Sequence, residues 1–266
     1  MAIEGRGSQE AQFAAATARI ERARTRAAQH GVRQLVVSDE NMLGTVRANL
    51  RMAELYPDAA SRLKRYADAF GGQVHRVVLS IRALDTFWAS ALAFGVARGH
   101  RLPSRCTLDD LADGSRSWRE VVEDAAAAFP QAEIQVHPHE RFCGRPEQRL
   151  AYMLGDGAPV PSKFTHFWRH SAPNLADLRS AVSARGEATS GLPSGDGHWQ
   201  PFNERQIAAL RETYDDDIFW LHSAGREVAT LIEESGLDQA RKNPPGGANR
   251  RGQNDDGQEG KLARAG

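Results

Sequence analysis

VHRVVLSIR, at positions 74–82, is the strongest strand pattern in the chain. Its apolar centre is uninterrupted and rich in β-branched residues, which is typical of a strand covered on both faces. The pattern ends at Arg82, and Asp85 or Thr86 can cap the helix expected next. Apolar residues then recur at helical spacing until Gly99, so this stretch predicts a strand followed by a helix.

The same alternation of strand and helix continues on both sides of this unit. Two more strands are expected, at 35–37 (LVV) and at 133–136. The helices expected around and after them lie at 9–30, 45–56, 58–70, 117–128, 146–154, 174–184, 203–214 and 215–235. Strands that alternate with helices predict an α/β domain in which a parallel sheet forms the middle of three layers.

The composition is balanced in charge, which leaves a local basic site as the remaining possibility. Lys and Arg total 34, as do Asp and Glu, so no bulk charge attracts nucleic acid or an anionic membrane. Apolar residues make up 41% of the chain, which suggests tails or long loops. We therefore expect one domain over residues 9–235, flanked by disordered segments at 1–8 and 236–266, where polar residues dominate.

Membrane and disulfide features are absent from the sequence pattern. No run approaches the roughly 18–20 apolar residues of a membrane span, and the first ten residues contain no apolar signal core. We expect a cytoplasmic protein without a membrane span. Cys106 and Cys143 have no metal-ligand spacing and are expected to be buried packing residues.

Ligands of open parallel sheets bind at the carboxyl ends of the strands, so residues just after each strand are the first candidates. Arg82 ends the strand at 74–81, and Ser90 follows on the next helix. A guanidinium and a hydroxyl suit a phosphate dianion. The alternative is a surface Arg and a helix Ser that bonds back to the backbone.

Two further strand ends carry polar side chains. Asp39 and Glu40, in the run 38–41 (SDEN), offer a general base, but the same run can also cap a strand-to-helix turn. His137 and His139 could share one face of an extended segment, but no third metal ligand has a recognisable spacing. We therefore predict no metal site. An aromatic cluster at 166–170 could line an acceptor pocket or act as packing.

Four segments of the sequence, taken in order, resemble motifs of the sulfotransferase family of P-loop proteins. VVLSIR at 77–82 with Ser90 is similar to the strand, Arg, helix and Ser of that family. AEIQV at 132–136 with Glu140 and MLG at 153–155 resembles its next strand and helix. GDGHW at 195–199 resembles a late loop, and residues 214–221 its closing helix.

The resemblance implies the P-loop fold and sulfuryl transfer from 3′-phosphoadenosine 5′-phosphosulfate to a hydroxyl or amine of a small-molecule or carbohydrate acceptor. It assigns the nucleotide 3′-phosphate to Arg82 and Ser90, and the general base to Glu40 or Asp39. A non-catalytic binding module that keeps the sheet is the alternative. A P-loop kinase relative is disfavoured, because no Lys lies in a phosphate-binding turn.

The chain departs from this family at its beginning. The family opens with a strand and a glycine-rich loop that holds the 5′-phosphosulfate, whereas this sequence has no such turn before Ser38. Either the start lies downstream of the true one, which we favour, or the function has been lost. If the strand is missing, we expect a gap between the strands at 74–81 and 133–136, with unpaired backbone groups and a poorly folded protein.

Overall fold

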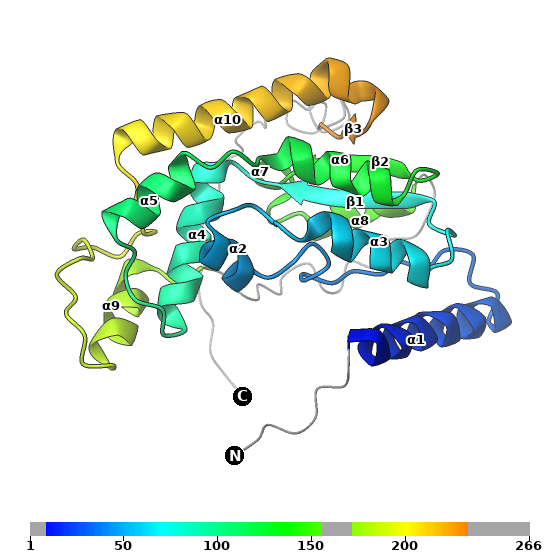
Figure 1. Cartoon of the computed structure of the whole chain (residues 1–266), viewed down its shortest axis with the longest axis horizontal. Helices are drawn as coiled ribbons and strands as arrows, with labels where there is room; N and C mark the ends of the chain where they lie inside the picture. The colour runs from blue at the N-terminus through cyan, green and yellow to red at the C-terminus, as the bar shows by residue number, and fades with distance from the viewer. Residues whose placement is uncertain (1–8, 156–171, 234–266) are drawn as a thin grey trace, which may run out of the picture. The chain divides into compact units, whose positions relative to one another are not determined.

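The computed structural model describes residues 9–155 and 172–233 (Figure 1). These residues belong to one compact unit, which extends to Glu233. Its α-helices are α1 Gln9–Gln29, α2 Val46–Met52, α3 Ala59–Ala69, α4 Leu84–Ala97, α5 Arg105–Ala112, α6 Trp118–Ala128, α7 His139–Phe142, α8 Pro146–Leu154, α9 Leu175–Ser183 and α10 Glu204–His222. Three strands, β1 Arg76–Ile81, β2 Glu133–Pro138 and β3 Thr230–Leu231, and a 3₁₀ turn, η1 Ala224–Glu227, complete it.

The strands form one parallel sheet in the order β1-β2-β3. β1 and β2 pair along their whole length, from Arg76 opposite Glu133 to Ile81 opposite Pro138. An α/β fold with a parallel sheet is therefore confirmed. The full three-layer sheet of the P-loop proteins stays a prediction, because the sheet of the described residues has three strands.

Helices contact both faces of this sheet. Leu79 and Ile81 of β1 are buried in the main hydrophobic core, together with residues of α6. Because side chains alternate along a strand, Ser80 points to the opposite face, where its hydroxyl accepts a hydrogen bond from Arg149 of α8 at 3.2 Å. One face of the sheet is thus apolar, and the other carries polar side chains.

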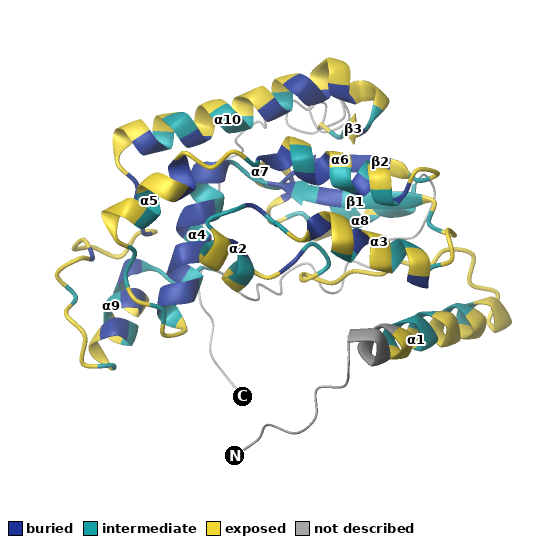
Figure 2. Cartoon of the chain, viewed as in Figure 1, coloured by how far each residue is buried: buried dark blue, intermediate teal, exposed yellow. Residues whose placement is uncertain are grey.

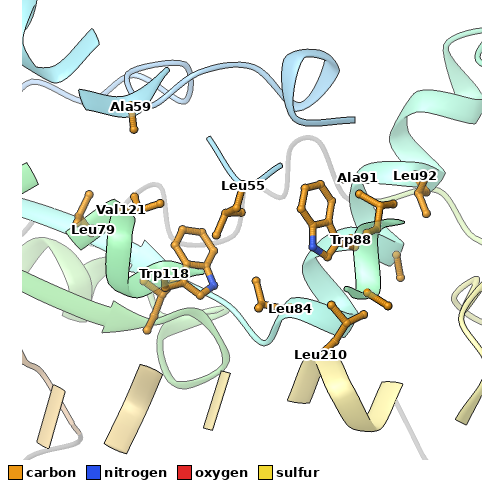
Figure 3. Packing of buried hydrophobic residues seen from close by; sticks show 14 of the residues in the cluster. Leu55, Ala59, Leu79, Leu84, Trp88, Ala91, Leu92, Trp118, Val121 and Leu210 are labelled. Carbon is orange, nitrogen blue, oxygen red and sulfur yellow. The ribbon is translucent and has the colours of Figure 1, made fainter. Parts of the chain in front are cut away.

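The core joins β1 to α3, α4, α6 and α10. Figure 3 shows part of it, where Trp118 and Val121 of α6 lie with Leu79 of β1 and Leu55. Rings also pack edge to face, with the centroids of Phe87 and Trp118 separated by 5.5 Å. In Figure 2 the buried residues gather on α4, α6 and β2, whereas α1 has only intermediate and exposed residues where it is described.

α10 is fixed to the core by buried charge. The Asp217 carboxylate accepts hydrogen bonds from the Ser117 hydroxyl at 2.6 Å and from the N–H groups of Trp118 at 3.0 Å and Arg119 at 3.2 Å. Ser117 and Glu120 form the capping box of α6, and Asp217 supplies a further acceptor to the donors at the start of this helix. Burial raises the pKa of Asp217 above its usual value.

The predicted strand at 35–37 is wrong. Residues 32–39 form no helix or strand, and Leu35, Val36 and Val37 are exposed. The expected gap between β1 and β2 is also wrong, because the two strands pair directly, with Val77 opposite Ile134. The backbone groups that we expected to lie unpaired between these strands are instead satisfied by each other.

Several boundaries also differ from the expectation. A single helix, α10, ends at His222 where two helices were predicted, and α5, α7 and β3 were not predicted. The N-cap of α4 is Ala83 rather than Asp85 or Thr86. Cys106 and Cys143 are exposed, so their predicted packing role is wrong. Segments 1–8 and 236–266 and the cluster at 166–170 lie outside the described residues.

Within the parts of the chain that the structure describes, no helix is both long enough and apolar enough to cross a membrane.

Candidate functional site

Arg82 lies directly after β1, at the carboxyl end of the sheet, as the sequence predicted. Its backbone carbonyl accepts a hydrogen bond from the indole N–H of buried Trp118 at 2.7 Å, which fixes the turn between β1 and α4. Its side chain is about one-third exposed, and Nε lies 3.9 Å from Oε1 of Glu140. Nε itself is buried and has no hydrogen-bond partner. Arg82 can therefore still donate a hydrogen bond to an anion.

Glu140 brings a carboxylate to the beginning of α4. Its Oε1 accepts a hydrogen bond from the N–H of Ala83, the N-cap residue, at 3.1 Å. Glu140 reaches this position because α7 follows β2 directly, and β2 is the neighbour of β1. A negatively charged group is therefore already held between a helix N-terminus and the guanidinium of Arg82, an environment that favours anions.

Ser90 lies further along the same helix. It is partly buried and follows Leu84, the first residue of α4, by six positions, which corresponds to about 9 Å along the helix axis. Among the described residues, no hydrogen bond joins Ser90 to Arg82. That both residues bind one phosphate stays a prediction.

Asp39 and Glu40 lie in an exposed turn. The Asp39 carboxylate accepts a hydrogen bond from the N–H of Asn41 at 2.7 Å, so it stabilises this turn but caps no described helix. The N-cap of the next helix is Thr45, whose hydroxyl accepts from Ala48 N–H. Neither acid contacts Arg82 or Ser90 in the described residues, and their role as general base stays a prediction.

The sequence analysis missed Arg149, a cation on the polar face of the sheet. Its Nη2 donates to the Ser80 hydroxyl, and its Nε is buried without a hydrogen-bond partner. Burial lowers the pKa of this guanidinium. The strand-end rule could not find Arg149, because it comes from α8 and reaches the sheet only through tertiary packing. Arg149 and Arg82 therefore each have an Nε without a hydrogen-bond partner, Arg149 beside Ser80 of β1 and Arg82 directly after that strand.

His137 is fully buried beneath α7 and α8. Its ring stacks on Phe142 at 4.8 Å between centroids, and Nδ1 has no hydrogen-bond partner. Burial, aided by the charges of Arg149 and Arg76, lowers the pKa of His137 to about 4. The pKa of His139 is also lowered, by burial and by Arg82. Both imidazoles are therefore neutral near pH 7.

The late loop that resembles the GDGHW motif is part of the core. Trp199 and Phe202 are buried, and the Gly197 carbonyl accepts the N–H of Leu175 at 2.9 Å. Arg179 donates to the carbonyls of Pro193 and Gly195, both at 2.7 Å. These contacts connect the loop to α9.

The described histidines, among them His137 and His139, belong to no cluster of metal-ligand side chains. In residues 9–155 and 172–233, no group of three or more His, Cys, Asp or Glu side chains is placed to hold a metal ion. What the strand ends do bring together is Arg82, Glu140 and the beginning of α4. This arrangement is suited to binding a charged oxygen ligand.

Comparisons with known proteins assign no family to this chain. No family model matches the sequence, and neither a curated protein nor a solved structure matches it. The likeness to sulfotransferases therefore rests on the quoted sequence segments.

Proposed function

We propose that this protein binds a phosphorylated adenine nucleotide at the carboxyl end of β1 and takes part in sulfuryl transfer from 3′-phosphoadenosine 5′-phosphosulfate to a hydroxyl or amine acceptor. The sequence resemblance supplies the reaction. The observation that carries the binding step is the Glu140 carboxylate, which lies 3.1 Å from the Ala83 amide and 3.9 Å from Arg82.

A nucleotide phosphate would use the same donors as this carboxylate. A phosphate oxygen can accept from a helix N-terminal N–H and from a guanidinium, as Glu140 does from Ala83. Binding would displace Glu140 and pair Arg82 through Nε, which has no hydrogen bond in the structure. Ser90 would supply a hydroxyl donor from the same helix.

The transfer step needs a base for the acceptor. An acceptor hydroxyl would attack the sulfur, its proton would pass to the carboxylate of Glu40 or Asp39, and the bond from sulfur to the bridging oxygen would break. Adenosine 3′,5′-bisphosphate leaves with that oxygen. Catalysis would come chiefly from positioning and from the cations that stabilise the leaving group.

A second candidate function is nucleotide binding without catalysis. It is favoured by the exposed turn at Asp39, whose carboxylate is already used by Asn41 N–H. The two functions differ in one measurement, because only the first predicts transfer of labelled sulfate from the donor to a panel of phenol, alcohol and amine acceptors. A Glu40→Gln variant that binds nucleotide normally and transfers nothing would identify Glu40 as the base.

Calorimetry with adenosine 3′,5′-bisphosphate tests the binding step. We expect Arg82→Ala to weaken binding about 10- to 100-fold, the scale of a charge-assisted hydrogen bond. Ser90→Ala should weaken it less, because a neutral hydroxyl is removed. Arg205→Ala, which removes an exposed cation on α10, is the matched control and should bind normally. Equal affinity of the wild type and Arg82→Ala would remove Arg82 from the site.

A further inference from the structure

β1 presents a free edge. It has one neighbour, β2, in the described sheet. The N–H of Glu133 donates to the His75 carbonyl, so residues of odd number on β1 turn their backbone groups toward β2. The backbone groups of Arg76, Val78 and Ser80 consequently point away from the sheet. Within the described residues none of these outward groups has a backbone partner.

A second segment of the same chain has exposed apolar side chains, and among its backbone groups only the N–H of Val32 has a backbone partner in the described residues, the Ala27 carbonyl. We call residues 32–37 the apolar segment. Of the large hydrophobic residues exposed in the described chain, four lie here: Val32, Leu35, Val36 and Val37, with 41–48% of each exposed. The segment contains neither proline nor regular structure, and its β-branched residues favour an extended strand.

Side-chain hydrogen bonds fix the apolar segment and the turn that follows it. Gln34 Nε2 donates to the carbonyl of Leu154 at 2.8 Å. Beyond the segment, Arg62 donates to the carbonyls of Asn41 at 2.5 Å and Met42 at 3.2 Å. One contact thus lies within the segment and two lie after it, and no hydrogen bond joins the segment to the β1 of its own chain in the described residues.

The two elements complement each other as neighbouring strands. If Val36 lies opposite Val78 in parallel register, Leu35 and Val37 share the apolar face of the sheet. The same register places Glu40 opposite Arg82, where the two side chains can form an ion pair. The antiparallel arrangement instead brings Arg33 close to Arg82, and the two positive charges repel. Charge complementarity therefore favours the parallel arrangement.

We propose that two copies of this protein associate by reciprocal strand addition, in which the apolar segment of each copy pairs with the free edge of β1 in the other. Each molecule carries both a donor strand and an acceptor edge, so the exchange closes with twofold symmetry. Main-chain hydrogen bonds and the burial of Leu35, Val36 and Val37 would stabilise the dimer. Glu40 and Arg82 would take part both in this interface and in the proposed nucleotide site, so the association is tested without nucleotide.

Sedimentation velocity across the micromolar range tests the association. The wild type should show a concentration-dependent monomer–dimer equilibrium. Val37→Pro removes the N–H that would donate to the Val78 carbonyl in this register, and a second variant, Leu35→Lys with Val37→Lys, removes the apolar contact. Each should weaken dimerisation at least tenfold. The control, Met52→Lys, alters another exposed apolar residue, on α2, and should leave the dimer intact. A monomeric wild type, or association that survives both variants, would overturn the proposal.

A mixing experiment distinguishes exchange between copies from pairing within one chain. With Cys106 and Cys143 replaced by Ser, a Val36→Cys protein is mixed with a Val78→Cys protein and oxidised. Strand addition predicts a disulfide-linked heterodimer far in excess of either homodimer, since residues 36 and 78 meet across the interface. If the double variant Val36→Cys, Val78→Cys forms only a bridge within one chain and the mixture forms none, the proposal fails.

Discussion

Glu140 competes with the proposed ligand for its donors, because its carboxylate meets the Ala83 N–H and approaches Arg82. Glu140→Gln keeps the shape of the side chain and removes its charge. We expect this variant to bind adenosine 3′,5′-bisphosphate about tenfold more tightly in calorimetry, because less charge must be displaced. Weaker binding by the variant would mean that Glu140 positions Arg82 rather than competing with the ligand.

His137 makes stability depend on pH. The unfolded chain takes up a proton near pH 6.5, whereas the folded chain does so only near pH 4. Between these values the unfolded state binds more protons, so the free energy of unfolding falls as the pH falls. The loss reaches about 3 kcal/mol below pH 4, from the 1.36 kcal/mol that corresponds to each pKa unit. Urea denaturation at a series of pH values measures it.

The matched variants for this pH dependence are His137→Gln and His30→Gln. His137→Gln removes the buried titrating group and should flatten the profile between pH 6.5 and 4. His30 is exposed at the end of α1, so His30→Gln should keep the wild-type slope. Parallel profiles for wild type and His137→Gln would assign the pH dependence to other groups.

At the scale of elements, α10 depends on Asp217. Asp217→Ala leaves the buried N–H of Trp118 without its acceptor and removes one of the two acceptors of both the Ser117 hydroxyl and the Arg119 N–H, while the capping box of Ser117 and Glu120 remains. We expect the free energy of unfolding to fall by about 3 kcal/mol, the scale of hydrogen bonds to a buried charge. Thermal or urea unfolding measures it. Asp216→Ala, at an exposed neighbouring position, should change stability little, and a loss as large as that of Asp217→Ala would contradict this role of Asp217.

Elements with strong local signals were predictable from sequence. α8 begins with Pro146 and ends before Gly155, as predicted, because proline at the first turn and glycine after the last are local signals. β1 and β2 were predicted because both contain apolar, β-branched residues. The segment at 35–37 has the same composition but found no partner strand, so its local preference gave no sheet.

The site was predictable only where it follows from position along a strand. Arg82 was expected at the carboxyl end of β1 and lies there. Arg149 and the contact from Glu140 to Ala83 depend on how α8 and α7 pack against the sheet, which local patterns do not encode. Cys106 and Cys143 failed as core residues for the same reason, because burial is a tertiary property.

At the scale of the whole molecule, β1 has one edge that is hydrogen-bonded to β2 and one edge without a partner strand in the described residues. The amides of Val77 and Leu79 face β2, whereas those of Val78 and Ser80 face outward. In dilute protein we expect hydrogen exchange to be much faster at Val78 and Ser80 than at their neighbours. At high protein concentration the strand addition proposed above should slow it. Uniform protection along β1 in dilute solution would show that the edge is already covered.

Trp118 donates a hydrogen bond to the Arg82 carbonyl, so the fluorescence of Trp118 should report ligand binding at Arg82. The indole is buried, and its N–H donates to the backbone of the residue that we propose to bind phosphate. A ligand that pulls on Arg82 alters the polarity around this ring, so nucleotide binding should shift tryptophan emission. Trp118→Phe should abolish most of that shift while calorimetry still detects binding. A shift of unchanged size would locate the response in another tryptophan.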